Sequence, residues 1–194
     1  IENVLPGIYK GKTVYVAGPS HAEEVAEGKL TGLIAASENA KNSIKVRELL
    51  RVPGIVAFSS FDVVGVQICS AAKNVIAVVY GALDAVSEHS QTFGDNSESL
   101  LMAAGLNEIQ ELGKAMGATH SETFTSIAGV GDLDVTCKSR FGRNRRFGKD
   151  IINTDILSNF KNLDDLIANI SKIGYLPEGA VACKYIHEIC EQKG

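Results

Sequence analysis

The sequence predicts an α/β segment followed by an all-helical segment. Short apolar runs bounded by Gly and Ser, the pattern of buried strands, occur before residue 60 and stop after it. Beyond residue 60 the apolar residues recur with helical spacing. With 194 residues and a hydrophobic content of 45%, the chain can bury a substantial core. We therefore expect a domain boundary near residue 60, with an α/β part at 1–60 and a helical domain at 61–194.

The first part is predicted to contain three strands and two helices. The strands correspond to the runs KTVYVA at 12–17, TGLIAAS at 31–37 and GIVAFS at 54–59. A short helix is expected over Ala22–Gly28 and a longer one over Ser37–Leu50. Ser37 is the predicted N-cap of the longer helix, because a Ser side chain can accept a hydrogen bond from a first-turn N–H group.

The second part is predicted to be helical throughout. Pro177 suits the first turn of the last helix, where its missing N–H is not needed. The first of these helices is apolar enough to raise the question of a membrane span, but Gln67, Lys73 and Asp84 interrupt it. We expect it to be the central helix of a globular domain. The six predicted helices are Asp62–Val86, Asn96–Met116, Ser121–Ile127, Arg143–Ile152, Asn162–Ile170 and Pro177–Glu191.

The distribution of Cys and His argues against disulfides and metal sites. The four cysteines form no C-x-x-C pair, and the four histidines are scattered with no H-x-x-x-H spacing. The first ten residues lack a basic segment followed by an apolar run, so no signal peptide is expected. We predict a cytoplasmic protein with reduced thiols, no bound metal and no integral membrane segment.

The stretch Gly129–Gly148, GVGDLDVTCKSRFGRNRRFG, indicates an anion-binding site. Between Lys138 and Lys149, six of twelve residues are cationic, whereas the chain as a whole has a net charge of −4. A local basic cluster in an acidic chain favours one small phosphorylated ligand over general affinity for polyanions. The alternative is nucleic-acid binding through residues 140–149, which would show a steep dependence on salt.

Lys73 is the candidate for proton transfer. In a helix it shares its face with small or apolar residues such as Cys69 and Ala77. Burial disfavours an ammonium group, so buried lysines have lowered pKa values and can exchange protons near neutral pH. Asp132 is the predicted partner. A lysine that extends along the helix surface to solvent, or that is paired only for stability, explains the position equally well.

Four segments in order resemble the NAD(P)-dependent glycerol-3-phosphate dehydrogenases. They are GPSHAEEVAEG (18–28), SAAKNVIAVVYGALDA (70–85), GDNSESLLMAAGLNEI (94–109) and the 129–148 stretch. The resemblance covers nearly the whole chain and implies the last strands of a Rossmann-like dinucleotide-binding domain followed by a multi-helical substrate domain. It also implies interconversion of dihydroxyacetone phosphate and sn-glycerol 3-phosphate by hydride transfer with NAD or NADP, a reaction of glycerophospholipid metabolism, in a homodimer.

The resemblance assigns roles to individual residues. Lys73 would be the general acid/base and Asp132 would hold it. The implied substrate-binding residues are Gly18, Ser20, Lys73, Asn74, Asp132, Thr136, Gly142, Arg143 and Asn144. Those implied near the dinucleotide are Ala22, Arg143, Leu176 and Glu178. If GDLDVT is helical, the four-residue spacing of Asp132 and Thr136 places both on one side. Arg145 and Arg146 are predicted to serve structure or the surface.

Three features depart from this assignment or qualify it. Bacterial members of the family commonly have Ser before Arg-Asn, whereas Gly142 stands here, so no hydroxyl contact is expected from that position. Gly18, Gly129 and Gly131 are also candidates for turns that need a positive φ. No Gly-x-Gly-x-x-Gly fingerprint occurs in the chain, so we expect it to be the later portion of a longer enzyme and inactive alone.

Two other function classes stay open at this point. The helical part could be a dimerisation or interaction domain without activity of its own, or the protein could be a related 3-hydroxy-acid dehydrogenase. The Arg-Asn-Arg-Arg run favours a phosphorylated substrate over a simple hydroxy acid. The preference for NAD or NADP depends on a residue that this sequence does not contain.

Overall fold

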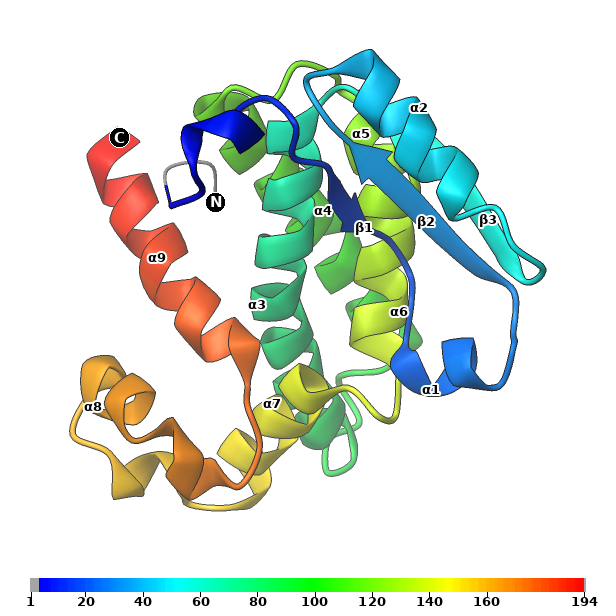
Figure 1. The fold of residues 1–194 in the computed structure, drawn as a ribbon. Coiled ribbons are helices and arrows are strands. Elements are labelled where there is room, and N and C mark those ends of the chain that lie inside the picture. Colours follow the sequence, from blue (N-terminus) through cyan, green and yellow to red (C-terminus); the bar gives the residue numbers. More distant parts are fainter. Residues whose placement is uncertain (1–3, 194) are drawn as a thin grey trace. The chain divides into compact units, whose positions relative to one another are not determined.

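A computed structural model describes residues 4–193 and contains a small sheet followed by helices (Figure 1). The sheet has the strands β1 (Tyr15–Ala17), β2 (Thr31–Ala36) and β3 (Ile55–Ser60). The helices α1 (Ala22–Ala26) and α2 (Ala40–Leu49) connect them, after a short 3-10 turn at Gly7–Tyr9. The predicted first strand is shorter than its apolar run, because only residues 15–17 pair with β2.

The strand order is β1-β2-β3, with one antiparallel and one parallel pair. Tyr15 pairs with Ala36 in the antiparallel ladder, and Thr31 pairs with Ile55 in the parallel one. The connection between the parallel strands is α2, as a crossover requires. Helix α2 begins later than predicted: Asn39, not Ser37, is its N-cap and accepts from the Lys41 N–H at 3.0 Å. The prediction for Ser37 was wrong because α2 begins only at Ala40: the Ser37 hydroxyl donates to the Thr13 carbonyl at 2.8 Å and accepts from the Asn39 N–H at 3.3 Å, ahead of the helix.

After Ser60 the described residues form helices and turns and no further strand, as the sequence predicts. The long helices are α3 (Val63–Ser87), α4 (Asp95–Met116), α7 (Arg143–Asn153) and α9 (Glu178–Lys193). The shorter ones are α5 (Glu122–Thr125), α6 (Asp132–Lys138) and α8 (Leu163–Ala168), with 3-10 turns at Ile156–Asn159 and Ile170–Ile173. Pro177 directly precedes α9 rather than lying in its first turn.

The predicted helix Ser121–Ile127 is wrong in its second half. Helix α5 ends at Thr125, and a π-helical turn at Ile127–Gly131 leads into α6. Gly129 explains the tight turn, because a Cβ at this position would lie 1.9 Å from the Phe124 carbonyl oxygen. Neither Gly129 nor Gly131 has a positive φ, so that alternative for them was also wrong, whereas Gly18 has a φ of +135°.

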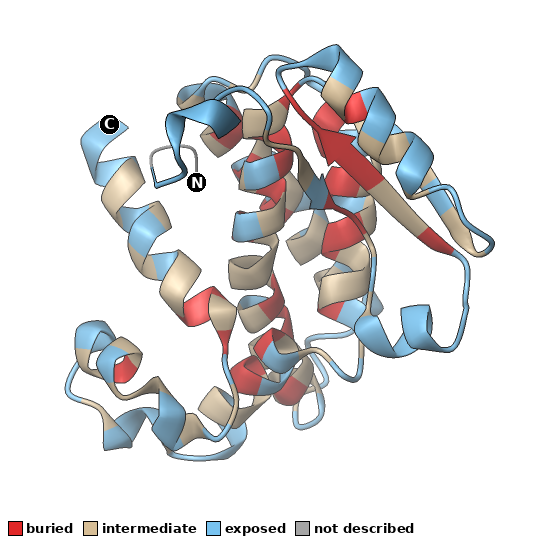
Figure 2. Cartoon of the chain, viewed as in Figure 1, coloured by how far each residue is buried: buried red, intermediate tan, exposed pale blue. Residues whose placement is uncertain are grey.

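The chain divides into two compact units. The first unit comprises residues 1–70 and 113–132, and the second comprises residues 71–112 and 133–194. The core of the first unit contains Ala17, Ile34, Ala36, Val66 and Ala128. Figure 2 shows the burial of β2, whose last three residues are all buried.

One core cluster of the second unit lies where α7, α8 and α9 pack together, and its buried members are Phe147, Leu166 and Ala180. Other buried apolar residues of this unit lie on α3, α4 and α6, among them Ala77, Ile109 and Leu133. Among residues 4–193, α3 is the helix with the length and apolar composition that a membrane span needs. Core helices of soluble proteins can have the same length and apolar composition.

Candidate functional site

Lys73 and Asn74 lie in the middle of α3 and belong to the second unit. Both are half-buried, while Ala72 and Ala77 of the same helix are buried. The positive charge of Lys73 acts on the Cys137 thiol of α6. Burial, and after it the negative charge of Asp134, raise the pKa of that thiol to about 12, and Lys73 is among the cations that oppose the shift. Lys73 of α3 and residue 137 of α6 are therefore electrostatic neighbours.

Asn144 connects three helices through its side-chain amide. Its Nδ2 donates to the Asn74 Oδ1 at 2.9 Å, and its Oδ1 accepts from the Gly179 N–H at 2.8 Å. The residue is 5% exposed, so both bonds are shielded from water. In a buried site, hydrogen bonds that satisfy both ends of an amide fix one geometry, because leaving either end unpaired costs free energy. Asn144 thereby sets the position of Asn74, a predicted substrate-binding residue.

Two glycines let α7 and α9 approach the backbone of α3. A Cβ at Gly148 would lie 1.9 Å from the Val78 carbonyl oxygen, and one at Gly179 would lie 2.4 Å from the Asn74 carbonyl oxygen. These are distances that real Cβ atoms do not show, so a side chain would push the helices apart. The close approach brings Asn144 and the start of α9 within hydrogen-bond reach of α3.

Arg143 and Glu178 form an ion pair between the first residues of α7 and α9. The Arg143 Nη2 lies 2.5 Å from the Glu178 Oε1. The Arg143 side chain is 58% exposed and the Glu178 side chain 35%, so most guanidinium donors stay accessible. Gly142 is the N-cap of α7 and has no side chain to bond the first-turn N–H groups. Leu176, 45% exposed, adds an apolar surface close in sequence to Glu178.

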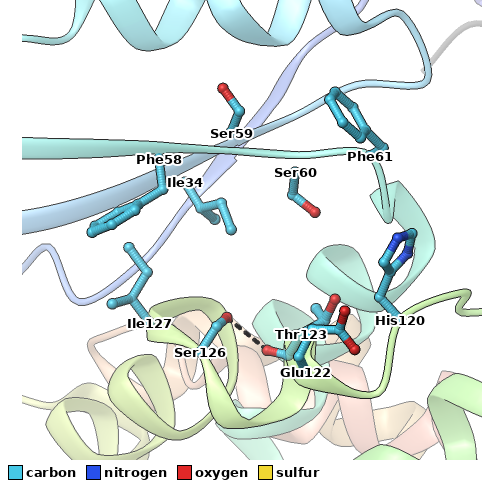
Figure 3. Close-up of a pocket in the computed structure, with 10 residues that line it drawn as sticks. All are labelled: Ile34, Phe58, Ser59, Ser60, Phe61, His120, Glu122, Thr123, Ser126 and Ile127. Carbon is cyan, nitrogen blue, oxygen red and sulfur yellow. Dashed lines mark hydrogen bonds between the residues drawn. The ribbon is translucent and has the colours of Figure 1, made fainter.

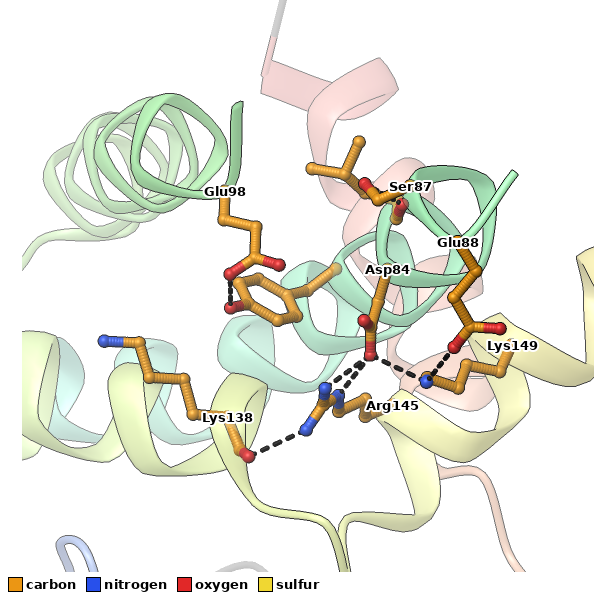
Figure 4. A network of polar contacts seen from close by, with 9 residues as sticks. Asp84, Ser87, Glu88, Glu98, Lys138, Arg145 and Lys149 are labelled. Atoms are coloured by element: carbon orange, nitrogen blue, oxygen red, sulfur yellow. Dashed lines mark hydrogen bonds and ion pairs between the residues drawn. The ribbon is translucent and has the colours of Figure 1, made fainter. Parts of the chain in front are cut away.

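Four other cations of the basic cluster, Lys138, Arg145, Arg146 and Lys149, are engaged by acidic groups of the same unit (Figure 4). Arg140 instead lies over the Phe141 ring, 5.2 Å from its centroid. Arg145 donates from Nε to the Asp84 Oδ2 at 2.9 Å and from Nη1 to the Lys138 carbonyl at 2.8 Å. Lys149 contacts Asp84 at 3.0 Å and Glu88 at 2.9 Å. Further pairs join Lys138 with Asp134 and Arg146 with Asp150. The cluster is thus largely neutralised within the protein, which disfavours a polyanion-binding surface.

Of the remaining predicted residues, Gly18, Ser20, Ala22 and Asp132 belong to the first unit and Thr136 to the second. Gly18 follows β1, and a Cβ there would lie 2.5 Å from the Gly32 carbonyl oxygen. Ser20 is exposed and donates to the Gly18 carbonyl at 3.2 Å. Ala22 begins α1 and is exposed. Asp132 is 2% exposed and begins α6, which is helical as the spacing of Asp132 and Thr136 requires.

Asp132 also influences a thiol of the first unit. Burial, together with the negative charges of Asp62 and Asp132, raises the pKa of the Cys69 thiol to about 12. Cys69 is therefore an inert thiol rather than a nucleophile. Within residues 4–193 no group of three His, Cys, Asp or Glu residues has the arrangement of a metal site.

Sequence reasoning missed the contribution of Gly148 and Gly179. Each glycine lies inside or at the start of a segment with helical periodicity, where glycine lowers helix stability by ~1 kcal/mol relative to Ala. That cost is the signal that could have revealed them, since a glycine in such a position often permits a close approach. The backbone N–H of Gly179, which binds Asn144, carries no sequence signal.

Comparison with known proteins gives one family for both parts of the chain. Residues 62–194 match the model of the NAD-dependent glycerol-3-phosphate dehydrogenase C-terminus. Residues 1–43 match the model of the N-terminus of the same family. A protein of Treponema denticola named glycerol-3-phosphate dehydrogenase (NAD(P)+) is 66% identical over 193 residues. The alignment covers 100% of this chain and 54% of that relative.

A second curated relative and two solved structures are also similar to this chain. A protein of the same name from Treponema pallidum is 58% identical over 97% of this chain and 53% of its own length. The crystal structure of glycerol-3-phosphate dehydrogenase from Coxiella burnetii superimposes with a TM-score of 0.78 at 29% identity, covering 92% of this chain and 50% of that one. The structure of a Dunaliella salina protein has the same fold, with a TM-score of 0.78 at 23% identity, over 93% of this chain and 30% of that one. The chain spans about half the length of the curated relatives it matches.

Proposed function

Because the chain belongs to the NAD-dependent glycerol-3-phosphate dehydrogenase family, we propose that it carries the substrate-binding and proton-transferring residues of such an enzyme. The reaction would interconvert dihydroxyacetone phosphate and sn-glycerol 3-phosphate. The main support is the arrangement at the start of α7, where exposed Arg143 lies beside buried Asn144, which in turn holds Asn74 next to Lys73.

Arg143 is the proposed phosphate ligand. Its guanidinium has five N–H donors, and the ion pair with Glu178 uses Nη2. The remaining donors can bind two phosphate oxygens in parallel. The first-turn N–H groups of α7 lack intrahelical partners and favour an anion at the same place. The Asn144 side chain is already bonded to Asn74 and Gly179, so we propose that its direct contribution to the phosphate is its backbone N–H.

Lys73 is the proposed general acid/base. Its Nζ would take the proton of the C2 hydroxyl during oxidation and return it to the carbonyl oxygen during reduction. We propose that Asp132 and Thr136 orient the lysine and the substrate oxygens, and that Gly18 and Ser20 line the substrate site. Asn74, fixed by Asn144, would contribute a polar contact to the same substrate.

The dinucleotide, when bound, supplies or accepts the hydride. Arg143, Leu176 and Glu178 combine an exposed cation, an exposed apolar side chain and a part-exposed carboxylate, and this set fits a ring with a carboxamide group. Ala22, exposed at the start of α1, is the proposed fourth contact. We propose NAD or NADP as the cofactor.

Domain organisation, location and assembly follow from the same family. The match to the N-terminal model ends at residue 43, β3 ends at Ser60 and the match to the C-terminal model begins at residue 62. We propose that the dinucleotide-binding and helical domains meet near residue 60. We also propose a cytoplasmic homodimer in which α3 is a core helix, because α3 carries Lys73, Asn74 and Asp84 and packs against glycines of α7 and α9.

The decisive experiment replaces Lys73 in the complete protein. Lys73→Met keeps the length of the side chain but has no titrating group, so kcat should fall by roughly 10²–10⁴ with dinucleotide affinity nearly unchanged. Lys45→Ala, at an exposed position of α2, is the matched control and should keep the parental kcat. A near-normal kcat for Lys73→Met in steady-state assays would remove this lysine from the mechanism.

A further inference from the structure

A cavity of about 470 Å³ lies in the first unit, between the sheet and the segment 120–127 (Figure 3). Ile34 of β2 and Phe58 and Ser60 of β3 point into it from the sheet, and Ser126 and Ile127 close the opposite side. Its size is within the range of ~300–1,000 Å³ that small-molecule sites occupy. No residue proposed above for substrate or cofactor lines it.

A network of hydrogen bonds holds the cavity open. The carboxylate of Asp62, 2% exposed, accepts from the Thr123 hydroxyl at 2.8 Å and from the Thr119 N–H at 3.1 Å. The Ser126 hydroxyl donates to the Thr123 carbonyl at 2.7 Å and accepts from the Ala128 N–H at 3.1 Å. These bonds fix the segment that forms one wall, so the cavity is preorganised and binding need not order it.

The rim of the cavity exposes aromatic surface. Phe58 is 46% exposed and Phe61 is 51% exposed, although both are large apolar side chains. Ile34 and Ile127 extend the apolar lining inward. Exposed apolar groups that gather around a concavity mark binding sites more often than isolated ones do. The cavity is therefore suited to a compact apolar or aromatic body.

The charge of the lining selects the polar end of the ligand. Among the described residues that line the cavity, none is Lys or Arg, and the ionisable side chains are Glu122, which supplies the carboxylate, and His120. Glu122 is exposed and accepts one hydrogen bond, from the Ser121 hydroxyl at 3.3 Å. A phosphate or carboxylate ligand would meet this negative charge without an arginine or lysine to offset it. An ammonium group would meet a carboxylate in a cavity that Phe58 and Phe61 also line, and both carboxylates and the faces of phenyl rings attract cations.

We propose that this cavity binds a small organic cation, an ammonium group on an aromatic or short alkyl body. This site would bind a cation, whereas the site proposed at Arg143 would bind the anionic phosphate. Binding here therefore does not require the dehydrogenase activity, and the two proposals can fail independently.

The test compares three probes of one shape on the whole protein at pH 8. Phenethylamine, 2-phenylethanol and 3-phenylpropanoate differ in charge but share a phenyl ring, and their dissociation constants are measured by ligand-observed NMR titration. The amine should bind about three- to tenfold more tightly than the alcohol, and the acid should bind most weakly. Equal affinity for all three probes, or no binding of the amine at millimolar concentration, would overturn the proposal.

Three variants locate the binding. Glu122→Gln removes one exposed charge and should bring the affinity for the amine to that for the alcohol. Phe61→Ala, outside the strands, should weaken the amine and the alcohol alike. Glu38→Gln, an exposed acidic position that does not line the cavity, is the charge-matched control and should change nothing. If Glu38→Gln weakens the amine as much as Glu122→Gln does, the attraction is a general effect of net charge and the proposed site is wrong.

Discussion

Two carboxylates, Asp62 before α3 and Asp84 near its end, are held in different ways. Asp62 accepts hydrogen bonds from neutral donors: the Gly65 N–H at 3.0 Å, the Thr123 hydroxyl and the N–H groups of Thr119 and His120. Asp84 is held by the cations Arg145 and Lys149. Asp62 is 2% exposed, and the Asp84 side chain is 16% exposed.

Both environments lower the pKa of the carboxyl group, by different means. Burial raises the pKa of Asp62, but the donors from Gly65, Thr123 and the 119–120 backbone outweigh it. Burial also raises the pKa of Asp84, and the side chains of Lys149 and Arg145 outweigh it. The first unit thus fixes a loop with uncharged donors, whereas the second uses ion pairs to anchor Arg145 and leaves Arg143 accessible.

Removing the Asp62 carboxylate should have the largest effect on stability. Asp62→Ala leaves the Gly65 N–H and the Thr123 hydroxyl buried without an acceptor, at ~1–3 kcal/mol for each group. We expect the free energy of unfolding to fall by about 3–5 kcal/mol, measured by urea denaturation. Asp155→Ala, at an exposed position, is the control. A loss below that of the control would mean that water replaces the carboxylate.

Substitutions at Arg143 and Arg145 should have different effects, the first on substrate binding and the second on stability. Arg143→Ala should raise KM for the phosphorylated substrate by at least about tenfold, because a charged hydrogen bond contributes ~1.5–3 kcal/mol. Some loss of dinucleotide affinity should accompany it. Arg145→Ala should change KM much less and should lower the thermal midpoint instead, since its donors serve Asp84 and Lys138.

Steady-state kinetics and thermal melts on both variants decide this point. If both variants raise KM equally, or if Arg145→Ala raises it more, then Arg143 is not the phosphate ligand. Arg145→Lys is a useful third variant, because it keeps the charge but loses the planar group that donates to two acceptors at once.

The ion pairs of Asp84 should contribute less to the free energy of unfolding than the hydrogen bonds of Asp62, and their contribution should depend on salt. Asp84→Asn should lower the free energy of unfolding by ~1–2 kcal/mol in low salt, less than the change at Asp62. Raising the ionic strength to 1 M, where the Debye length is ~3 Å, should shrink the effect of this variant but not that of Asp62→Ala. Parallel urea titrations at two salt concentrations measure both. If salt changes the effects of both variants equally, then Asp84 is not held mainly by ion pairs.

The smallest expected effect is on acid stability. A carboxyl group whose folded-state pKa is lowered stabilises the fold above its unfolded pKa of ~3.9, and this contribution is lost as the pH falls through the lower folded value. The wild-type protein should therefore lose stability below about pH 4, at up to ~1.4 kcal/mol per pH unit for one such group. Asp62→Asn should have a shallower pH dependence in that range. Equal slopes for the variant and the wild-type protein would mean that Asp62 does not titrate with unfolding.

The order of strands and helices could be predicted from the sequence, because apolar periodicity is a local property of each segment. The three strands before residue 60, the long helices after it and the family all follow from patterns within single segments. The site residues Lys73, Asp132, Arg143 and Asn144 could be listed from motifs for the same reason. Their arrangement into one catalytic site stays a prediction.

Which polar side chains form hydrogen bonds within the fold, and are therefore not available to a ligand, depends on contacts between distant segments. Ser37 has the chemistry of an N-cap, but its hydroxyl bonds the Thr13 carbonyl, 24 residues away, and the Asn39 N–H, and the helix begins later, where Asn39 caps it. Asn144 has the chemistry of a phosphate ligand, yet its amide is bonded to α3 and α9. Propensity is a property of one segment, whereas a hydrogen bond between distant segments depends on where close packing at glycines such as Gly148 places their backbones.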